Sequence, residues 1–149
     1  MGLFCSSSIT EALPGYDGEM VNTLTANGSG YIAKSDTRPI TFYQGAEGSV
    51  LDADGLPIPR EDITGWLLYI AFYSGETCAA IDLVLEVVIS PQDALEGIFS
   101  GNISDDDTFL LPVGEIYVSM FTINAAGQKQ IQDMAQIEIT PCGSDRREQ

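Results

Sequence analysis

Hydrophobic and polar side chains alternate along several short segments of this chain, a pattern typical of β-strands with one buried face. The clearest example follows the turn sequence "DITG". Its expected inward side chains are Trp66, Leu68, Ile70 and Phe72, and its expected outward ones are Leu67, Tyr69, Ala71 and Tyr73. We expect Trp66, the only tryptophan, to fill the space between two sheets, and the alternative is a tryptophan that stacks on a ligand.

Further segments show the same kind of pattern and are separated by turn sequences such as "DADGLPIP" and "NAAG". The expected strands are Ile40 to Gln44, Ile81 to Ile89, Gly97 to Ile103, Glu115 to Ile123 and Lys129 to Thr140. Their expected inward side chains are Ile40, Phe42, Ile81, Leu83, Leu85, Val87, Ile89, Ile131, Ala135, Ile137 and Ile139. The segment "SDDDTFLLPVG" is expected to carry one helical turn before Pro112. Six or seven strands without a long helix predict an all-β, immunoglobulin-like antiparallel sandwich.

The length of 149 residues fits one domain with an additional arm. We expect the sandwich to span residues 39–141, with a polar C-terminal tail at 142–149. Residues 1–38 are expected to form an extended N-terminal arm with one short strand-like run, Val21 to Ala26. The apolar side chains of this arm predict that it docks on a partner, and they include Leu3, Phe4, Ile9, Leu13, Val21 and Leu24.

The chain is strongly acidic, with 22 acidic and 6 basic residues and a formal net charge of −16. Nucleic acids and anionic membranes are bound through clustered Lys and Arg, so both are excluded as partners. The acidity is explained by a solvated, repulsive surface, and the alternative is a calcium-rich or basic partner. We expect no secretory signal and no membrane span. The start "MGLFCS" matches a myristoylation pattern at Gly2 with Cys5 placed for a palmitate, and we interpret the match as chance.

The residue types that commonly carry catalysis are missing or badly placed. Histidine is absent, which removes imidazole bases and imidazole metal sites. Cys5, Cys78 and Cys142 lack the spacing of a zinc site, and we expect reduced thiols, with a Cys78–Cys142 bridge or a crosslink through Cys5 as alternatives.

Carboxylates are the remaining candidates for a site. The pair Asp52 and Asp54 and the run Asp105, Asp106 and Asp107 lack the spaced loop of an EF-hand. We interpret the run as a solvated turn or a helix N-terminus, with weak calcium binding as the alternative. The sequence therefore predicts no catalytic residue, no cofactor-binding residue and no metal ligand, and hence no enzyme.

Three stretches resemble a phage family. "ITFYQG", "DADGLPIPREDITGWLLYIAFYSG" and "LEGIFSGNISDDDTFLLPVGEIYVSMFTINAAGQKQ" are similar to the N-terminal immunoglobulin-like domain of siphophage baseplate upper proteins. The shared motifs are a D-x-D-G-x-P turn, a D-x-T-G turn before a core strand, an L-P-x-G-x-Y strand and a closing hairpin. The resemblance covers roughly residues 39–141.

The resemblance implies a non-enzymatic structural protein of the virion. The first hypothesis is a tail, baseplate or fibre-attachment component that packs against other virion proteins and forms a homo-oligomer in a particle assembled in the host cytoplasm. One alternative is a capsid decoration (cement) protein on the head exterior. Another is a sugar-binding adhesive domain that uses exposed tyrosines, although the six tyrosines are scattered along the chain. A lipid-anchored cytosolic protein is the last alternative.

Overall fold

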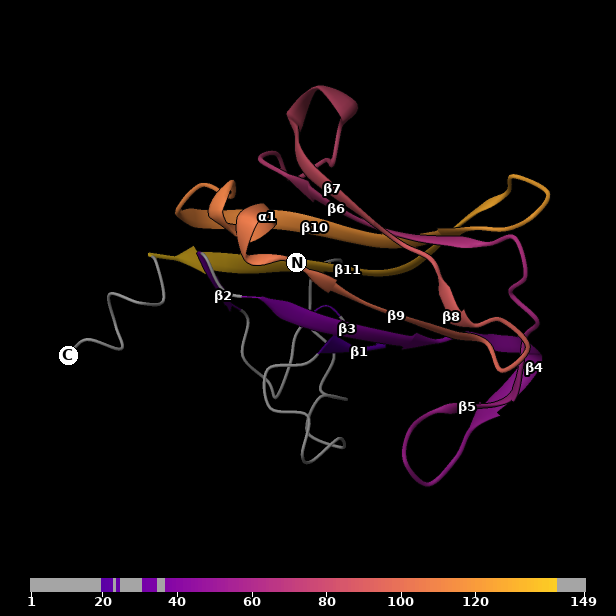
Figure 1. Ribbon diagram of the computed structural model, residues 1–149. Coiled ribbons are helices and arrows are strands. Elements are labelled where there is room, and N and C mark those ends of the chain that lie inside the picture. The colour runs from indigo at the N-terminus through magenta and orange to yellow at the C-terminus, as the bar shows by residue number, and fades with distance from the viewer. Residues whose placement is uncertain (1–19, 23, 25–30, 35–36, 142–149) are drawn as a thin grey trace.

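Two β-sheets lie face to face, and a two-stranded ribbon extends from one end of them (Figure 1). The computed structural model describes residues 20–22, 24, 31–34 and 37–141. The four-stranded sheet has the order β1 (Met20–Val21), β3 (Arg38–Tyr43), β9 (Ile98–Ile103) and β8 (Pro91–Asp93). The five-stranded sheet has the order β2 (Tyr31–Ala33), β11 (Lys129–Thr140), β10 (Gly114–Ile123), β6 (Leu67–Tyr73) and β7 (Leu83–Ile89). The ribbon consists of β4 (Gly45–Leu51) and β5 (Pro57–Arg60).

The hydrophobic core lies between the two sheets, which confirms the predicted all-β sandwich. Strand β3 buries Ile40 and Phe42, as its alternation predicted. The ring of Phe42 lies 6.2 Å from that of Phe99 on the neighbouring strand β9. Strands β6, β10 and β11 supply the other side of the core with the buried side chains Leu68, Ile70, Phe72, Ile116, Val118, Met120, Ala135, Ile137 and Ile139.

The predicted helical turn is also present, as α1 (Asp105–Phe109). It begins after Ser104, whose hydroxyl accepts a hydrogen bond from the Asp107 amide at 3.1 Å. The acidic run therefore forms the first turn of a helix, where negative charge is favourable. Within the helix Thr108 is fully buried, as is Leu111 just after it.

Two segments of the predicted arm are strands of the sandwich. Strand β1 pairs in parallel with β3, and β2 pairs in parallel with β11, so each segment extends one sheet by an edge strand. Leu24 and Ile32 lie in the core. The prediction of an arm outside the sandwich is therefore wrong for these segments, because their apolar side chains complete the core instead of awaiting a partner.

Other parts of the predicted arm and tail lie outside the described residues. These are the lipidation match at Gly2, the cysteines Cys5 and Cys142, the arm side chains Leu3, Phe4, Ile9 and Leu13, residues 23, 25 and 26 of the run Val21 to Ala26, and the tail 142–149.

Strand β7 is shorter and less buried than its alternation predicted. Ile81 belongs to a 3-10 turn (Ala80–Asp82) and is 91% exposed, and Leu83 is exposed as well. The rest of the strand reaches the core as predicted, since Val87 and Ile89 are buried and Leu85 is partly buried and packs against the core. Figure 1 shows the reason: the β6–β7 hairpin extends beyond the four-stranded sheet, so its tip has no sheet opposite it.

Strand β11 spans the predicted residues, but its inward face changes along its length. The pairing with β10 shifts between Met120 and Phe121, which leaves Gln132 as the extra residue of a β-bulge. A bulge moves every side chain beyond it to the opposite face. Ile131 is therefore 48% exposed, and the prediction that it faces the core is wrong.

Candidate functional site

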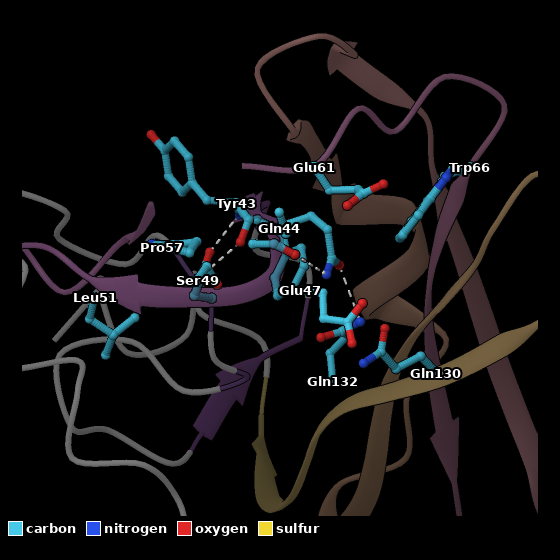
Figure 2. Close-up of a pocket in the computed structure, with 14 residues that line it drawn as sticks. Tyr43, Gln44, Glu47, Ser49, Leu51, Pro57, Glu61, Trp66, Gln130 and Gln132 are labelled. Carbon is cyan, nitrogen blue, oxygen red and sulfur yellow. Dashed lines mark hydrogen bonds between the residues drawn. The ribbon is translucent and has the colours of Figure 1, made fainter. Parts of the chain in front are cut away.

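A groove of about 590 Å³ opens at the end of the sandwich where β3 leaves its sheet and enters the ribbon (Figure 2). We call it the Trp66 groove. It is lined by Asn22, Phe42, Tyr43, Gln44, Gly45, Ala46, Glu47, Ser49, Leu51, Pro57, Glu61, Trp66, Gln130 and Gln132. Figure 2 shows Trp66 and Glu61 on one side of its central amide groups and Ser49, Pro57 and Leu51 on the other.

The backbone around Gln44 fixes the floor of the groove. The Gln44 amide donates to the Gly97 carbonyl at 2.8 Å, and the Gln44 carbonyl accepts from the Glu61 amide at 3.0 Å. Gly97 has a φ of +70°, and a Cβ there would lie 2.8 Å from the Glu61 oxygen and 2.9 Å from the Gln44 oxygen. Only glycine fits this position without moving the chain. These contacts hold together the end of β3, the end of β5 and the beginning of β9 at one end of the sandwich.

The bulge in β11 directs Gln132 toward this floor. Its side-chain nitrogen donates to Gln44 Oε1 at 3.2 Å and to Thr122 Oγ1 at 3.0 Å. Gln44 in turn donates from Nε2 to the Gly45 carbonyl at 3.1 Å. Bulges often redirect a side chain beside a functional site. Here the result is an ordered network of amides at a position that would otherwise carry core side chains.

Trp66 lies at the rim of the groove and not between the sheets. It is partly buried, packs against the edge of the core and also lines a second hollow of about 350 Å³. The predicted phase of the strand is right, since Leu68, Ile70 and Phe72 are buried. Trp66 precedes β6 at the open end of the sandwich, where amides face it in place of a packed core. The prediction that it fills the core is therefore wrong.

The turn before Trp66 is held by its own polar side chains. Asp62 accepts hydrogen bonds from the amide and the hydroxyl of Thr64, at 3.0 and 2.6 Å, and these bonds lower the pKa of the Asp62 carboxyl. Gly65 supplies a φ of +82°. Ile63 is fully buried, and its amide donates to the Ala94 carbonyl at 2.9 Å. The motif "DITG" is therefore a rigid anchor that sets the position of Trp66.

The acidic residues that the sequence offered as site candidates stabilise local backbone structure. Asp52 Oδ1 accepts from the amides of Asp54 and Leu56, which ties the tip of the ribbon. The run Asp105, Asp106 and Asp107 forms the first turn of α1, and none of these residues lines the groove. Within the described part of the chain, no group of three or more His, Cys, Asp or Glu side chains could hold a metal ion.

Cys78 is the one cysteine that the structure describes, and it is free and partly buried. Burial raises the pKa of its thiol, and the nearby Lys129 lowers that pKa by a smaller amount. A raised pKa disfavours the thiolate, so this position is not activated as a nucleophile.

The comparisons with known proteins concern the fold. No protein-family model and no curated protein matches the chain. Among solved structures, the N-terminal domain of phage TP901-1 ORF48 is similar, with 15% identity and a TM-score of 0.41 over 83% of this chain and 94% of that domain. CopC from Methylosinus trichosporium OB3b is similar with 14% identity and a TM-score of 0.37, over 76% and 84% of the two chains.

Proposed function

We propose that this chain is a non-enzymatic structural protein of a bacteriophage virion, at the tail, baseplate or fibre-attachment region, where it packs against other virion proteins. The sequence motifs that resemble baseplate upper proteins support this function. Each of their turns has a matching local geometry, since Gly55, Gly65, Gly114 and Gly127 all have a positive φ. These motifs therefore specify the turns of the sandwich.

The observation that carries the proposal is the ribbon formed by β4 and β5. Within the described residues its two strands pair only with each other, and Figure 1 shows them extending away from the sandwich. Val50 pairs with Ile58, and both side chains are exposed, Val50 by 64%. An isolated two-stranded hairpin is marginally stable in water, and a cluster of exposed apolar side chains marks an interaction surface. A neighbouring virion protein that covers the ribbon would stabilise the hairpin and bury its exposed apolar side chains.

Strand β7 offers a second contact surface, at the edge of the five-stranded sheet. Its outward side chains Val84 and Val88 are exposed, as is Ile81 at its beginning. An open edge strand presents unpaired amides and carbonyls, which a strand of another chain can pair with. We expect this edge to join copies of the chain in the assembled particle, which would make the protein a homo-oligomer there.

The charge of the chain narrows the partners. A net charge of −16 disfavours contact with nucleic acid or with an anionic lipid surface. In the described part of the chain, no helix is both long and apolar enough to cross a membrane. The expected partners are therefore proteins of the virion, and the expected location is the assembled particle.

Co-purification of the full chain with virion proteins encoded beside it tests the proposal. The wild-type protein should form a complex with a tail, baseplate or fibre protein that size-exclusion chromatography detects. Val50→Asp should abolish the complex without lowering the melting temperature, because Val50 is an exposed ribbon residue. The matched control is Leu95→Asp, which places the same charge at an exposed apolar residue outside the ribbon and should bind like wild type.

The other outcomes of this experiment are equally definite. A complex with the major capsid protein alone would establish the capsid decoration alternative. Binding that Val50→Asp and Leu95→Asp leave unchanged would remove the ribbon as the contact surface. Absence of a complex with every such protein would contradict the proposed function.

A further inference from the structure

The Trp66 groove is built from groups that suit a neutral, hydroxyl-rich ligand. None of its 14 lining residues is basic, and four of them are amides: Asn22, Gln44, Gln130 and Gln132. Its volume of about 590 Å³ falls in the range of small-molecule sites, about 300–1,000 Å³. The second hollow, which Trp66 also lines, shares Gln130 and adds Thr122, Asn124, Gln128 and the basic Lys129. An elongated ligand could therefore occupy both hollows and pass over the indole.

The hydrogen-bonding groups of the groove are partly ordered and partly unused. Gln132 commits both of its N–H groups to Gln44 and Thr122, which leaves its own Oε1 as a fixed acceptor. Among the described residues, the side chains of Gln130 and Glu61 and the indole N–H of Trp66 have no hydrogen-bond partner. A site with ordered acceptors beside available donors can recognise hydroxyl groups at a small entropic cost.

The same inventory argues against other ligand classes. In the Trp66 groove Glu47 and Glu61 repel an anion, and the net charge of −16 outweighs the single basic residue of the second hollow, Lys129. A purely apolar ligand would leave the amides without water and without partners, which costs free energy for each buried group. A sugar meets both requirements, because the C–H groups on one face of a pyranose pack on an aromatic ring while its hydroxyls bind amides and carboxylates.

We propose that the Trp66 groove binds a neutral oligosaccharide. In this site Trp66 packs on the face of one sugar unit, and Gln130, Gln132 and Glu61 form hydrogen bonds with its hydroxyls. The orientation in Figure 2 fits this arrangement, since Glu61 and Gln130 lie above and below the part of the groove that Trp66 borders. The ribbon lines one side of the groove, but Val50 and Ile58 are not among the lining residues, so the proposal does not depend on the structural function proposed above.

Trp66 is the only tryptophan, so intrinsic fluorescence reports on this site directly. The full chain would be titrated with cellotriose, maltotriose and tri-N-acetylchitotriose, and with trigalacturonate as the charged control. At least one neutral trisaccharide should shift the emission of Trp66 in a saturable way. Trigalacturonate should not.

Two glutamines of the same strand provide the decisive variants. Gln130→Ala should weaken the binding of that trisaccharide roughly tenfold in calorimetry, as expected for one lost hydrogen bond. Gln136→Ala is the matched control, because Gln136 lies on β11 outside the groove and contacts Glu115. It should bind like wild type, and both variants should keep the wild-type melting temperature.

Three results would overturn the proposal. They are no saturable response to any of the neutral trisaccharides, equal binding of trigalacturonate, or a response that Gln130→Ala leaves unchanged. If Gln130→Ala weakens a complex with a virion protein and leaves sugar binding unchanged, the groove is a protein contact surface instead. The Val50→Asp experiment is unaffected by each of these outcomes, so the two proposals can fail separately.

Discussion

Two of the connections that carry the chain from the four-stranded to the five-stranded sheet close the two ends of the sandwich differently. The connection from β9 to β10 is short and buries Thr108 and Leu111, so it fills its end with packed side chains. The connection from β3 to β6 runs out along the ribbon and returns through Glu61, leaving the Trp66 groove. One end is therefore packed and the other is open, and four substitutions can test this difference.

The largest effect is expected at the closed end, from Leu111→Ala. Leu111 is fully buried in the core beside α1, so truncation leaves a cavity that the neighbouring strands cannot fill. We expect a loss of about 2–5 kcal/mol in the free energy of unfolding. Urea denaturation followed by circular dichroism measures it, with exposed Leu110→Ala as the matched control within about 0.5 kcal/mol of wild type. Similar losses for both variants would show that this end is not packed as described.

At the open end, Gly97→Ala should have the next largest effect. The new Cβ would meet two backbone oxygens, and the positive φ adds strain for any residue with a side chain. We expect a loss of about 1–3 kcal/mol in thermal or urea unfolding. The control is Gly127→Ala, which has a positive φ of +84° but open space around its Cβ. Equal losses for the two variants would mean that only the φ strain destabilises Gly97→Ala, and that close packing around Gln44 does not contribute.

The alternation of side chains predicted the closed parts of the sandwich well. Each of the strands β3 and β6 keeps one face on the core along most of its length. A period of two residues is therefore enough to assign Ile40, Phe42, Ile70 and Phe72 to the core. The turn glycines were equally readable, because a positive φ is a local requirement.

The errors arose where burial depends on distant parts of the chain. Ile81 has the right pattern, but the opposite sheet does not reach it. Ile131 changes face because of a bulge, for which the only local sign is Asp133 within an expected apolar set. Leu24 follows β1 and Ile32 lies in β2, and both of these short parallel edge strands have partners far along the chain.

The candidate site escaped prediction for the same reason. Gln44 and Gln132 are separated by 88 positions and meet only after both sheets have formed. A single glutamine in a β-strand carries no local signal that distinguishes a binding group from an exposed polar residue. Trp66 was singled out by its type, but its place at the rim follows from where the ribbon leaves the sandwich.

Trp66→Ala should cost less than the core substitutions, because Trp66 is only partly buried. We expect a loss of about 1–2 kcal/mol, which is below the range for a fully buried large aromatic residue. Urea unfolding followed by circular dichroism measures it, since the variant lacks the fluorophore. In the wild type, acrylamide should quench the emission of Trp66 in the native state. A loss as large as that of Leu111→Ala, together with emission protected from acrylamide, would place Trp66 in the core after all.

The smallest effect is expected at the border between the two regions, from Asp133→Asn. Asp133 lies opposite the buried Met120, and its carboxylate accepts from the Leu24 amide at 2.9 Å, which ties the segment before β2 to the core. Burial raises the pKa of the Asp133 carboxyl in the folded state, and hydrogen bonds from the amides of Leu24 and Met134 lower it by less. An asparagine keeps an acceptor for Leu24 and removes the cost of burying a charge. The variant should therefore be slightly more stable at neutral pH, by less than about 1 kcal/mol.

The dependence of stability on pH tests the sign of the effect predicted for Asp133→Asn. The folded state holds the Asp133 proton more tightly than the unfolded chain does, so the contribution of Asp133 to stability falls as pH rises through its folded pKa. The advantage of Asp133→Asn should therefore be largest at neutral pH and shrink as the pH is lowered and the wild-type carboxyl takes up its proton. Paired urea titrations of the two proteins at several pH values measure this difference, and the other acidic groups, which both share, cancel from it. Asp133→Ala serves as the control for the hydrogen bond and should be less stable than Asp133→Asn by about 1 kcal/mol at every pH. An advantage that grows toward acidic pH would mean that the ionised carboxylate stabilises the fold, and that the closed part of the sandwich does not extend to this position.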